Sequence, residues 1–336
     1  MALPIRPYSG TKIKKSVVFT GYRCNNQCLF CMESEKRAYP ERDTRTVMRD
    51  IAVARRSGSD YLEIIGGEAT IRPDILQLVE FASSRGFKTV MLATNGRMLS
   101  YPDFAKKLVR AGVTDLVFSI HGHNAKVHDM LTGAKGSFDE LMLGIANLRK
   151  LGFDRIGSNT AIVKPNYQYL PALGRILLAQ KIRNSEFIFA DCNEGGVRKN
   201  YAQLGARISK AAPYMRALLE LGQRNGLDSW YVRYVPLCHF QEYLDQVSEI
   251  NEQLSFLTEH IAGDFINRDV AASRIKVGRA KSPVCKNCIL NASCEGIWKH
   301  YAQIWGTGEL KAVKKLKTQR KAKPQAGLPV TKERRA

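Results

Sequence analysis

The sequence has no hydrophobic run that approaches the roughly 20 residues needed to cross a membrane as a helix. Its N-terminus, MALPIRPYSGTKIKK, contains basic residues but no apolar segment behind them, so it lacks the pattern of a secretory signal. These two absences predict a cytoplasmic protein with no membrane partner. In that compartment thiols stay reduced, and disulfides are not expected.

Acidic residues are also scarce. The 336 residues include 31 Asp and Glu against 52 Lys and Arg, which gives a formal net charge of +21. Residues 311–336 hold ten of the Lys and Arg and one Glu, so this segment carries +9 and the rest of the chain +12. Because the segment lacks a sustained apolar period, we predict a disordered basic tail. Such a tail can attract nucleic acid, but basic tails often serve only solubility, and we do not favour a nucleic-acid function.

The chain also has few cysteines for a disulfide-linked protein. The eight cysteines are too few and too clustered for a disulfide scaffold, which makes metal binding the leading interpretation. Three of them lie in GYRCNNQCLFCME, as Cys24, Cys28 and Cys31. A structural zinc site usually has four ligands, yet the next histidine along the chain is His121. Three thiolates on one loop can instead converge on a cluster of four irons and leave one iron open.

Short apolar strand candidates alternate with amphipathic helical stretches along the first 200 residues or so. Strands are predicted at 15–20, 61–65, 88–93, 115–120, 158–163 and 186–190, and helices at 43–57, 73–85, 101–111, 137–151 and 167–181. This alternation predicts a parallel α/β fold whose right-handed crossovers place the loops after the strands on one face. The cysteine loop and the motifs GGE, TNG and HGH all follow strands there. After about residue 208 the alternation stops, and helices are predicted near 208–224 and 241–260.

Together these motifs resemble the radical S-adenosylmethionine (SAM) superfamily. The similar features are CxxxCxxC after the first strand, GGEAT after the second, TNGR after the third and SIHG…HDMLTGAKGSFDE after the fourth, over about residues 15–195. The resemblance implies a partial (β/α)6 TIM-like barrel and a [4Fe–4S] cluster on Cys24, Cys28 and Cys31. It also implies the chemistry: an electron from the cluster cleaves SAM to methionine and a 5′-deoxyadenosyl radical, which abstracts hydrogen from a substrate.

The resemblance further implies which residues bind SAM. Contacts to its amino group are expected from Gly66, Gly67 and Glu68, and Phe30 is expected by the adenine. The remaining candidates are Asn95 in the TNG motif and, for the ribose hydroxyls, Ser119 and Asn159. Alternatives from the residues alone stay open. Glu68 could simply favour a helix N-terminus, Asn95-Gly96 could be an ordinary turn, and the local histidines could serve only in hydrogen bonding: His121, His123 and His128.

A second cysteine group, CKNCILNASCEG, contains Cys285, Cys288 and Cys294, and Cys238 lies upstream in VPLC. It resembles the auxiliary-cluster regions of many radical SAM enzymes, and the short twitch form more than the longer SPASM form. Four thiolates match a second [4Fe–4S] cluster with full ligation, while a four-cysteine zinc site is the alternative. We therefore predict a lead-in (1–14), a core partial barrel (15–207), an auxiliary-cluster region (208–310) and a basic disordered tail (311–336).

The sequence leaves the substrate open. Cys192 and Glu194, after the sixth strand, are substrate-side candidates at the barrel mouth, although Cys192 could be a buried free thiol. The favoured function is a radical SAM enzyme that acts on an anionic or nucleoside-like small molecule and is reduced by a flavodoxin- or ferredoxin-type donor. The alternative is a peptide or protein maturase, which is weakened because we expect no leader-binding domain in the roughly 14 residues before the first strand. A distant alternative is a zinc-ribbon-like nucleic-acid-binding protein.

Overall fold

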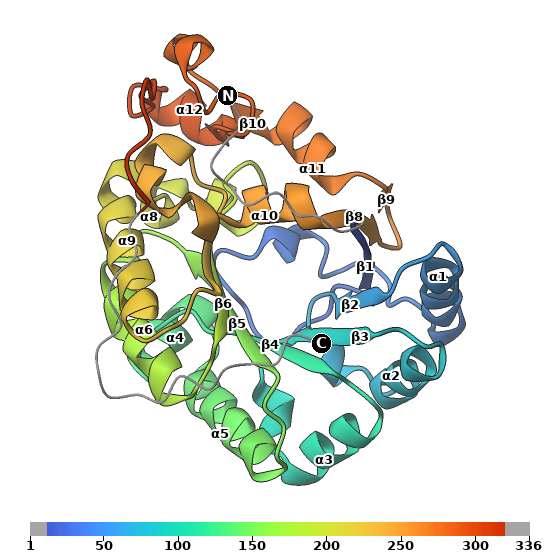
Figure 1. Cartoon of the computed structure of the whole chain (residues 1–336). Helices are drawn as coiled ribbons and strands as arrows, with labels where there is room; N and C mark the ends of the chain where they lie inside the picture. Colours follow the sequence, from blue (N-terminus) through green and yellow to red (C-terminus); the bar gives the residue numbers. More distant parts are fainter. Residues whose placement is uncertain (1–11, 320–336) are drawn as a thin grey trace.

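A curved and mostly parallel sheet organises the fold in the computed structural model, which describes residues 12–319 (Figure 1). The strand order is β7-β6-β5-β4-β3-β2-β1-β8-β9, and all neighbours are parallel except β8 and β9. The strands are β1 (Ile13–Phe19), β2 (Tyr61–Ile65), β3 (Thr89–Thr94), β4 (Asp115–Ser119), β5 (Ile156–Ile162), β6 (Asn184–Phe189), β7 (Trp230–Arg233), β8 (Phe256–Ile261) and β9 (Ile266–Asn267).

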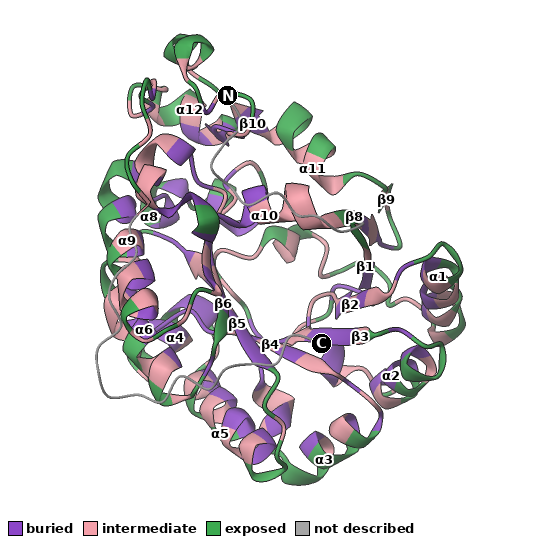
Figure 2. Cartoon of the chain, in the orientation of Figure 1, coloured by how far each residue is buried: buried purple, intermediate pink, exposed green. Residues whose placement is uncertain are grey.

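Helices cover the outer face of this sheet and bury their apolar sides against it (Figure 2). Local capping sets where several begin: the side chain of Asp43 accepts from the N–H of Thr46 at the start of α1, as Asn124 does for α4. The helices of this layer are α1 (Thr44–Arg56), α2 (Ile75–Ser84), α3 (Pro102–Arg110), α4 (Ala125–Thr132), α5 (Ser137–Lys150), α6 (Leu170–Ala179) and α9 (Ile208–Arg224). The segment after β6 forms two short helices, α7 (Gly195–Lys199) and α8 (Tyr201–Leu204).

The alternation predicted from sequence is confirmed: six predicted core strands correspond to β1–β6 and five predicted helices to α1, α2, α3, α5 and α6. The sheet, however, extends beyond six strands, because β7 adds to β6 and β8 adds to the outer edge of β1. The predicted helix over 241–260 is wrong over its last five residues, which form a strand. The whole segment forms a 3-10 turn (Gln241–Gln246), α10 (Ser248–Ser255) and then β8.

The partial barrel is not closed by strand pairing, since β7 and β8 do not pair with each other in the described range. Instead α10 lies between these two edges. A bridge joins Val232 of β7 to Val247 just before α10, and Glu252 of α10 pairs with Arg233 of β7 at 2.7 Å. The segment from 230 to 261, predicted as part of a C-terminal region, thus completes the wall of the barrel.

The remaining chain contacts β8 through α11 (Val270–Ser273) and the end of β6 through Trp298, whose indole donates to the Phe189 carbonyl at 3.3 Å. It comprises α11, a π-helical turn (Arg274–Gly278), the antiparallel pair β10 (Arg279–Ala280) and β11 (Ile297–Trp298), and α12 (Lys299–Trp305). Residues 311–319, which we predicted to begin the disordered tail, lie against this region: Val313 is 4% exposed, and the Gln319 amide donates to the carbonyl of Gln241 at 3.0 Å. The rest of the predicted tail, 320–336, lies outside the described residues. No helix between residues 12 and 319 is long and apolar enough to span a bilayer.

Candidate functional site

The loop that carries the first three cysteines, residues 20–31, is held directly by the loop after β2. The N–H of Gly67 donates to the carbonyl of Gly21 at 2.9 Å, and the N–H of Glu68 donates to that of Arg23 at 2.8 Å. The two backbones approach so closely that a Cβ on Gly67 would lie 2.1 Å from the carbonyl oxygen of Arg23. Glycine at this position is therefore a steric requirement of the contact.

The Glu68 side chain joins the ends of β2 and β3. It is 3% exposed, and it accepts from the Thr70 N–H at 3.1 Å, the Thr94 hydroxyl at 2.7 Å and the Asn95 N–H at 2.6 Å. Burial raises the pKa of this carboxyl, and the hydrogen bonds oppose that shift. Among residues 12–319 the oxygen that accepts from the Asn95 N–H has no second donor, so it keeps an unused lone pair.

The loop after β3 also hydrogen-bonds to the cysteine loop. The Asn95 amide donates to the Asn25 side chain at 2.7 Å and lies 3.9 Å from the sulfur of Cys24. Arg97 donates to the carbonyl of Asn25 and, at 3.1 Å, to the Asn26 side chain. Sequence reasoning did not single out Arg97. The sequence feature that could have indicated this residue is its position directly after the Asn95-Gly96 turn.

A third contact comes from the loop after β6, where Gly195 and Gly196 begin α7. The N–H of Gly196 donates to the carbonyl of Cys31 at 2.8 Å. A Cβ on Gly196 would lie 2.1 Å from the carbonyl oxygen of Leu29, and one on Gly195 would lie 2.5 Å from that of Met32. Gly195 also has a left-handed φ of +65°. These two glycines, missed at the sequence level, hold the end of the cysteine loop opposite Gly67.

The other predicted SAM-side residues lie around the inner face of the sheet. Phe30 is half-buried, with its ring centroid 4.5 Å from that of His121. Ser119 and Asn159 are register partners on β4 and β5 and are both half-buried. Their neighbour Phe118 is fully buried toward the helices, so alternation places Ser119 on the opposite, inner face. The fold therefore brings Ser119 and Asn159 together on adjacent strands.

The histidines after β4 serve local hydrogen bonds. His121 Nδ1 accepts from the Ala161 N–H at 3.1 Å, and His128 Nδ1 accepts from the His121 N–H at 3.2 Å. Burial lowers the pKa of His121 well below its usual value and lowers that of His128 to about 4, so both rings are neutral near pH 7. His123 stacks on Tyr169. These contacts agree with the structural interpretation of the three residues.

The first cysteine group fits an iron–sulfur centre in its donor set. The three cysteines lie on one short loop, and burial, together with the nearby Cys24 and Cys31, raises the pKa of the Cys28 thiol to about 12. Cys24 also accepts from the Asn26 N–H at 3.3 Å, the kind of bond that stabilises and tunes a cluster thiolate. Within residues 12–319 no three His, Cys, Asp or Glu side chains already stand in metal-ligand geometry.

The second group is brought together from three parts of the chain. Burial, followed by Cys294, Cys285 and Cys288, raises the pKa of Cys238 to about 11. The sulfur of Cys294 accepts from the N–H groups of Leu237 and Gly296, both at 3.4 Å, and that of Cys288 accepts from the Val313 N–H at 3.3 Å. The last contact comes from the segment predicted to be tail. Backbone donors aimed at sulfur suit a cluster here as well.

The two substrate-side candidates differ in their placement. Cys192 is 2% exposed, and burial followed by the nearby Asp191 raises the pKa of its thiol to about 12. This placement favours the alternative of a buried free thiol. Glu194 is exposed at the start of α7. Asn193, between them, joins the barrel to the C-terminal region: its amide donates to the Gly278 carbonyl and accepts from the His300 N–H, both at 3.0 Å.

A buried chain of ion pairs runs from β7 to the second cysteine group. Arg233 pairs with Glu252 at 2.7 Å, and Glu252 with Arg274 at 3.1 Å. Arg274 in turn pairs with Glu295 at 2.7 Å, and Glu295 with Arg279 at 3.3 Å. Arg274, Arg279 and Glu295 have side chains no more than 7% exposed. Because Glu295 adjoins Cys294, this network ties the second cysteine group to the barrel.

Tyr234 lies at the centre of this network. Its ring is 4.9, 5.2 and 5.0 Å from the guanidinium carbons of Arg233, Arg274 and Arg279. It also has a left-handed φ of +64°, a costly conformation for a residue with a side chain. Tyr234 directly follows β7, so it lies at the carboxyl end of a barrel strand, where ligands of barrel proteins bind.

The fold and the site define an α/β partial-barrel protein with a cysteine loop at the carboxyl ends of its strands. Residues 18–172 match the family model described as the Radical SAM superfamily. Residues 18–172 therefore form a radical SAM domain, and members of that superfamily use a [4Fe–4S] cluster and SAM. The resemblance noted in the sequence is thus confirmed, and the zinc-ribbon-like alternative is not favoured.

Curated relatives match over part of their length. The chain is 35% identical over 147 residues to the AdoMet-dependent heme synthase of Methanosarcina barkeri, covering 43% of this chain and 41% of the relative. It is 32% identical over 150 residues to the mycofactocin maturase MftC of Mycolicibacterium smegmatis (44% and 38%). It is 31% identical over 167 residues to the GTP 3′,8-cyclase of Peptoclostridium acidaminophilum (44% and 50%). The chain therefore spans half or less of these relatives.

Solved structures share the fold over most of the chain. Streptococcus suis SuiB bound to the precursor peptide SuiA superposes with a TM-score of 0.57 at 15% identity, covering 90% of this chain and 75% of SuiB. Native anSMEcpe with bound AdoMet gives a TM-score of 0.56 at 11% identity, covering 89% of this chain and 92% of that one. At such low identity these likenesses establish the fold alone.

Proposed function

We propose that this protein reductively cleaves SAM at a [4Fe–4S] cluster held by Cys24, Cys28 and Cys31, and uses the resulting radical to abstract hydrogen from a substrate. The observation that carries the proposal is that three loops contact the cysteine loop and fix its position. Loops after β2, β3 and β6 each hold it through backbone contacts that require glycine or through amide and guanidinium donors. Such preorganisation is what a metal site needs from its surroundings.

The chain's own residues would orient SAM beside that cluster. Gly66 and Gly67 allow the cysteine loop to lie directly against the end of β2 and would offer backbone groups to the SAM ammonium. The remaining lone pair of Glu68 would accept from the same ammonium. Phe30 would pack on the adenine, and Ser119 with Asn159 would meet the ribose hydroxyls from adjacent strands. Asn95 would act more indirectly, by fixing the cysteine loop through Asn25.

We further propose that Cys238, Cys285, Cys288 and Cys294 hold an auxiliary [4Fe–4S] cluster. Support comes from the electrostatic effect of Cys285, Cys288 and Cys294 on Cys238 and from the backbone N–H groups that donate to the sulfurs of Cys288 and Cys294. The division into a lead-in, a barrel over 15–207, an auxiliary region over 208–310 and a tail stays part of this proposal. Strands β7 and β8 then belong in sequence to the auxiliary region and in space to the barrel wall.

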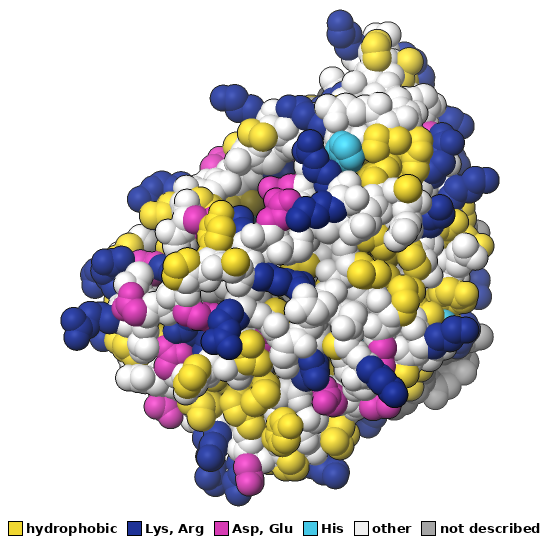
Figure 3. All heavy atoms as spheres, turned by 180° about the vertical axis from the view of Figure 1, so that it is seen from behind, with side chains coloured by type: hydrophobic (Ala, Val, Ile, Leu, Met, Phe, Trp, Pro, Cys, Tyr) yellow, Lys and Arg dark blue, Asp and Glu magenta, His cyan; other side chains and the backbone are white. Residues whose placement is uncertain are grey.

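The substrate we propose is a small anionic or nucleoside-like molecule in the cytoplasm, with a flavodoxin- or ferredoxin-type protein as electron donor. The net charge of +21 supports an anionic substrate, and Lys and Arg side chains are spread over the face drawn in Figure 3. Relatives named as a heme synthase and a GTP cyclase also support a small molecule. The mycofactocin maturase relative keeps a peptide substrate as the second candidate. Transfer of deuterium from deuterium-labelled candidate substrates into 5′-deoxyadenosine would separate these classes.

Iron and sulfide quantitation after anaerobic reconstitution tests the two cluster assignments. We expect about eight irons per chain in the wild type and about four after Cys24→Ala/Cys28→Ala/Cys31→Ala. The matched control is Cys192→Ala, which removes a thiol outside both groups and should leave the iron content unchanged. Zinc in place of iron, or loss of iron in the Cys192 variant, would contradict the assignment.

A further inference from the structure

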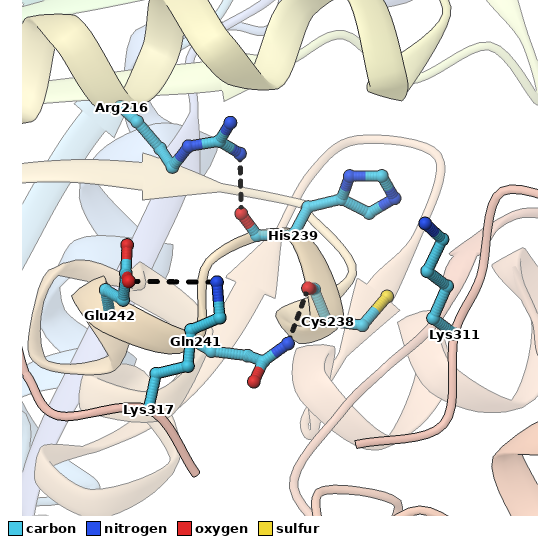
Figure 4. Close-up of a pocket in the computed structure, with 7 residues that line it drawn as sticks. All are labelled: Arg216, Cys238, His239, Gln241, Glu242, Lys311 and Lys317. Carbon is cyan, nitrogen blue, oxygen red and sulfur yellow. Dashed lines mark hydrogen bonds and ion pairs between the residues drawn. The ribbon is translucent and has the colours of Figure 1, made fainter.

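A basic pocket opens beside Cys238, one of the proposed auxiliary ligands. It has a volume of about 340 Å³ and is lined by Arg216, Cys238, His239, Gln241, Glu242, Lys311 and Lys317 (Figure 4). Three of the lining side chains are cationic. The one carboxylate, Glu242, pairs with Lys317 at 3.8 Å, and Figure 4 shows the Cys238 sulfur directed toward the Lys311 side of the pocket.

The surrounding segment exposes positive charge almost exclusively. Residues 281–319 contain seven Lys and two Glu, with no Arg or Asp. Neither glutamate offers a free charge at the surface: Glu295 is buried against Arg274, and Glu309 pairs with Arg207 at 3.0 Å. The positive field around the second cysteine group therefore has no exposed acidic counterpart within that segment.

Apolar side chains stand out among these lysines. Val284 is 45% exposed and Ile289 is 51% exposed, and they directly adjoin Cys285 and Cys288 in sequence. Lys286 lies between them and is exposed. Apolar groups rimmed by charge of one sign are the composition of a protein-docking surface. A pocket for a small anion would not need the apolar groups outside it.

We propose that this basic surface, made of the pocket beside Cys238 together with Val284, Lys286 and Ile289, docks an acidic one-electron carrier of the flavodoxin type. The inference rests on the proposed auxiliary cluster, because a redox partner docked on this surface would lie close to Cys238, one of the proposed ligands of that cluster. In the transfer the flavin hydroquinone is oxidised to the semiquinone. One electron reduces the protein's iron–sulfur centre, and no bond forms or breaks in the protein.

Calorimetric titration of the reconstituted protein with oxidised flavodoxin tests the surface without relying on turnover. The variant Lys286→Glu/Lys311→Glu/Lys317→Glu reverses three of its charges. We expect its Kd for flavodoxin to rise at least about tenfold at low salt, with the difference shrinking as salt screens the charges. Inorganic phosphate, titrated alone, is the probe for a small-anion site.

The matched control is Lys106→Glu/Arg110→Glu/Lys150→Glu. It makes the same change in net charge on exposed residues of α3 and α5, which lie at the end of the molecule opposite α12 and β10 (Figure 1). We expect its Kd to stay within about twofold of the wild type. An unchanged Kd in the first variant, an equal rise in the control, or saturable phosphate binding without flavodoxin binding would overturn the proposal.

Failure of this inference is distinguishable from failure of the proposed function. With dithionite as reductant no docking is needed, so all three proteins should form 5′-deoxyadenosine at the same rate. If dithionite-driven cleavage is normal while flavodoxin binding ignores the charge reversals, only the docking surface is refuted. If the wild type forms no 5′-deoxyadenosine with dithionite, the proposed function fails.

Discussion

Gly67→Ala is the most severe single test of how the cysteine loop is held. The added Cβ would lie 2.1 Å from the Arg23 carbonyl oxygen and 2.4 Å from that of Tyr22, whereas ordinary contact begins at 3.4 Å. The obstructing atoms are backbone, so no side-chain rotation relieves the overlap. The cysteine loop or the β2 loop must then shift by about 1 Å. We expect overpacking to cost about 1–3 kcal/mol of folding free energy.

The larger effect should fall on the site. A displacement of about 1 Å in a positioning element can cost about 100-fold in rate, so Gly67→Ala should lower SAM cleavage far more than its loss of stability explains. Iron content, SAM binding by calorimetry and 5′-deoxyadenosine formation with dithionite measure this directly. Gly308→Ala is the control, because a Cβ there meets nothing within 4 Å. Full iron content and cleavage within about twofold of wild type in Gly67→Ala would refute the reasoning.

Three further predictions concern residues that act at a distance from substrate. Arg97→Lys keeps the charge but loses the planar guanidinium whose Nη1 donates to two loop acceptors while its Nε donates to Glu140. Cluster retention in anaerobic gel filtration should therefore fall toward that of Arg97→Ala; retention equal to wild type would contradict this. Arg274→Met removes a buried cation from between two carboxylates and should cost about 3–5 kcal/mol in urea unfolding, whereas a loss below about 1 kcal/mol would show that the network is dispensable. Burial raises the pKa of Glu249 to about 7, so the folded protein holds this proton more tightly than the unfolded chain and loses stability as pH rises from about 4.5 to about 7. In Glu249→Gln the Tm should depend less steeply on pH over that window, and an unaltered slope would refute the assignment.

Much of the barrel follows from local sequence. Apolar runs such as YLEII and KTVMLA are short and bounded by turn residues, which indicates buried parallel strands, and the motifs after them fall at the carboxyl ends of β2 and β3. The glycines of GGE could also be predicted locally, because β2 ends at Ile65 and the backbone must turn after it.

Other features depend on partners that the local pattern does not contain. FLTEHI at 256–261 is a strand because the outer edge of β1 pairs with it, and no short-range signal reports that edge. Gly195 and Gly196 read as a turn until the fold brings them against the cysteine loop. The lysines of 311–319 suggest disorder. Val313, however, buries its side chain and donates its N–H to the sulfur of Cys288. The network around Tyr234 joins residues up to 62 positions apart, from Arg233 to Glu295.

The central claim is that Cys24, Cys28 and Cys31 hold a cluster that cleaves SAM. The most direct test is 5′-deoxyadenosine, quantified by mass spectrometry after anaerobic incubation of the reconstituted protein with SAM and dithionite. The account predicts its formation by the wild type and by Cys192→Ala, and none above background by the variant that lacks the three cysteines. Formation of 5′-deoxyadenosine by that variant, or its absence from an iron-replete wild type, would contradict the claim.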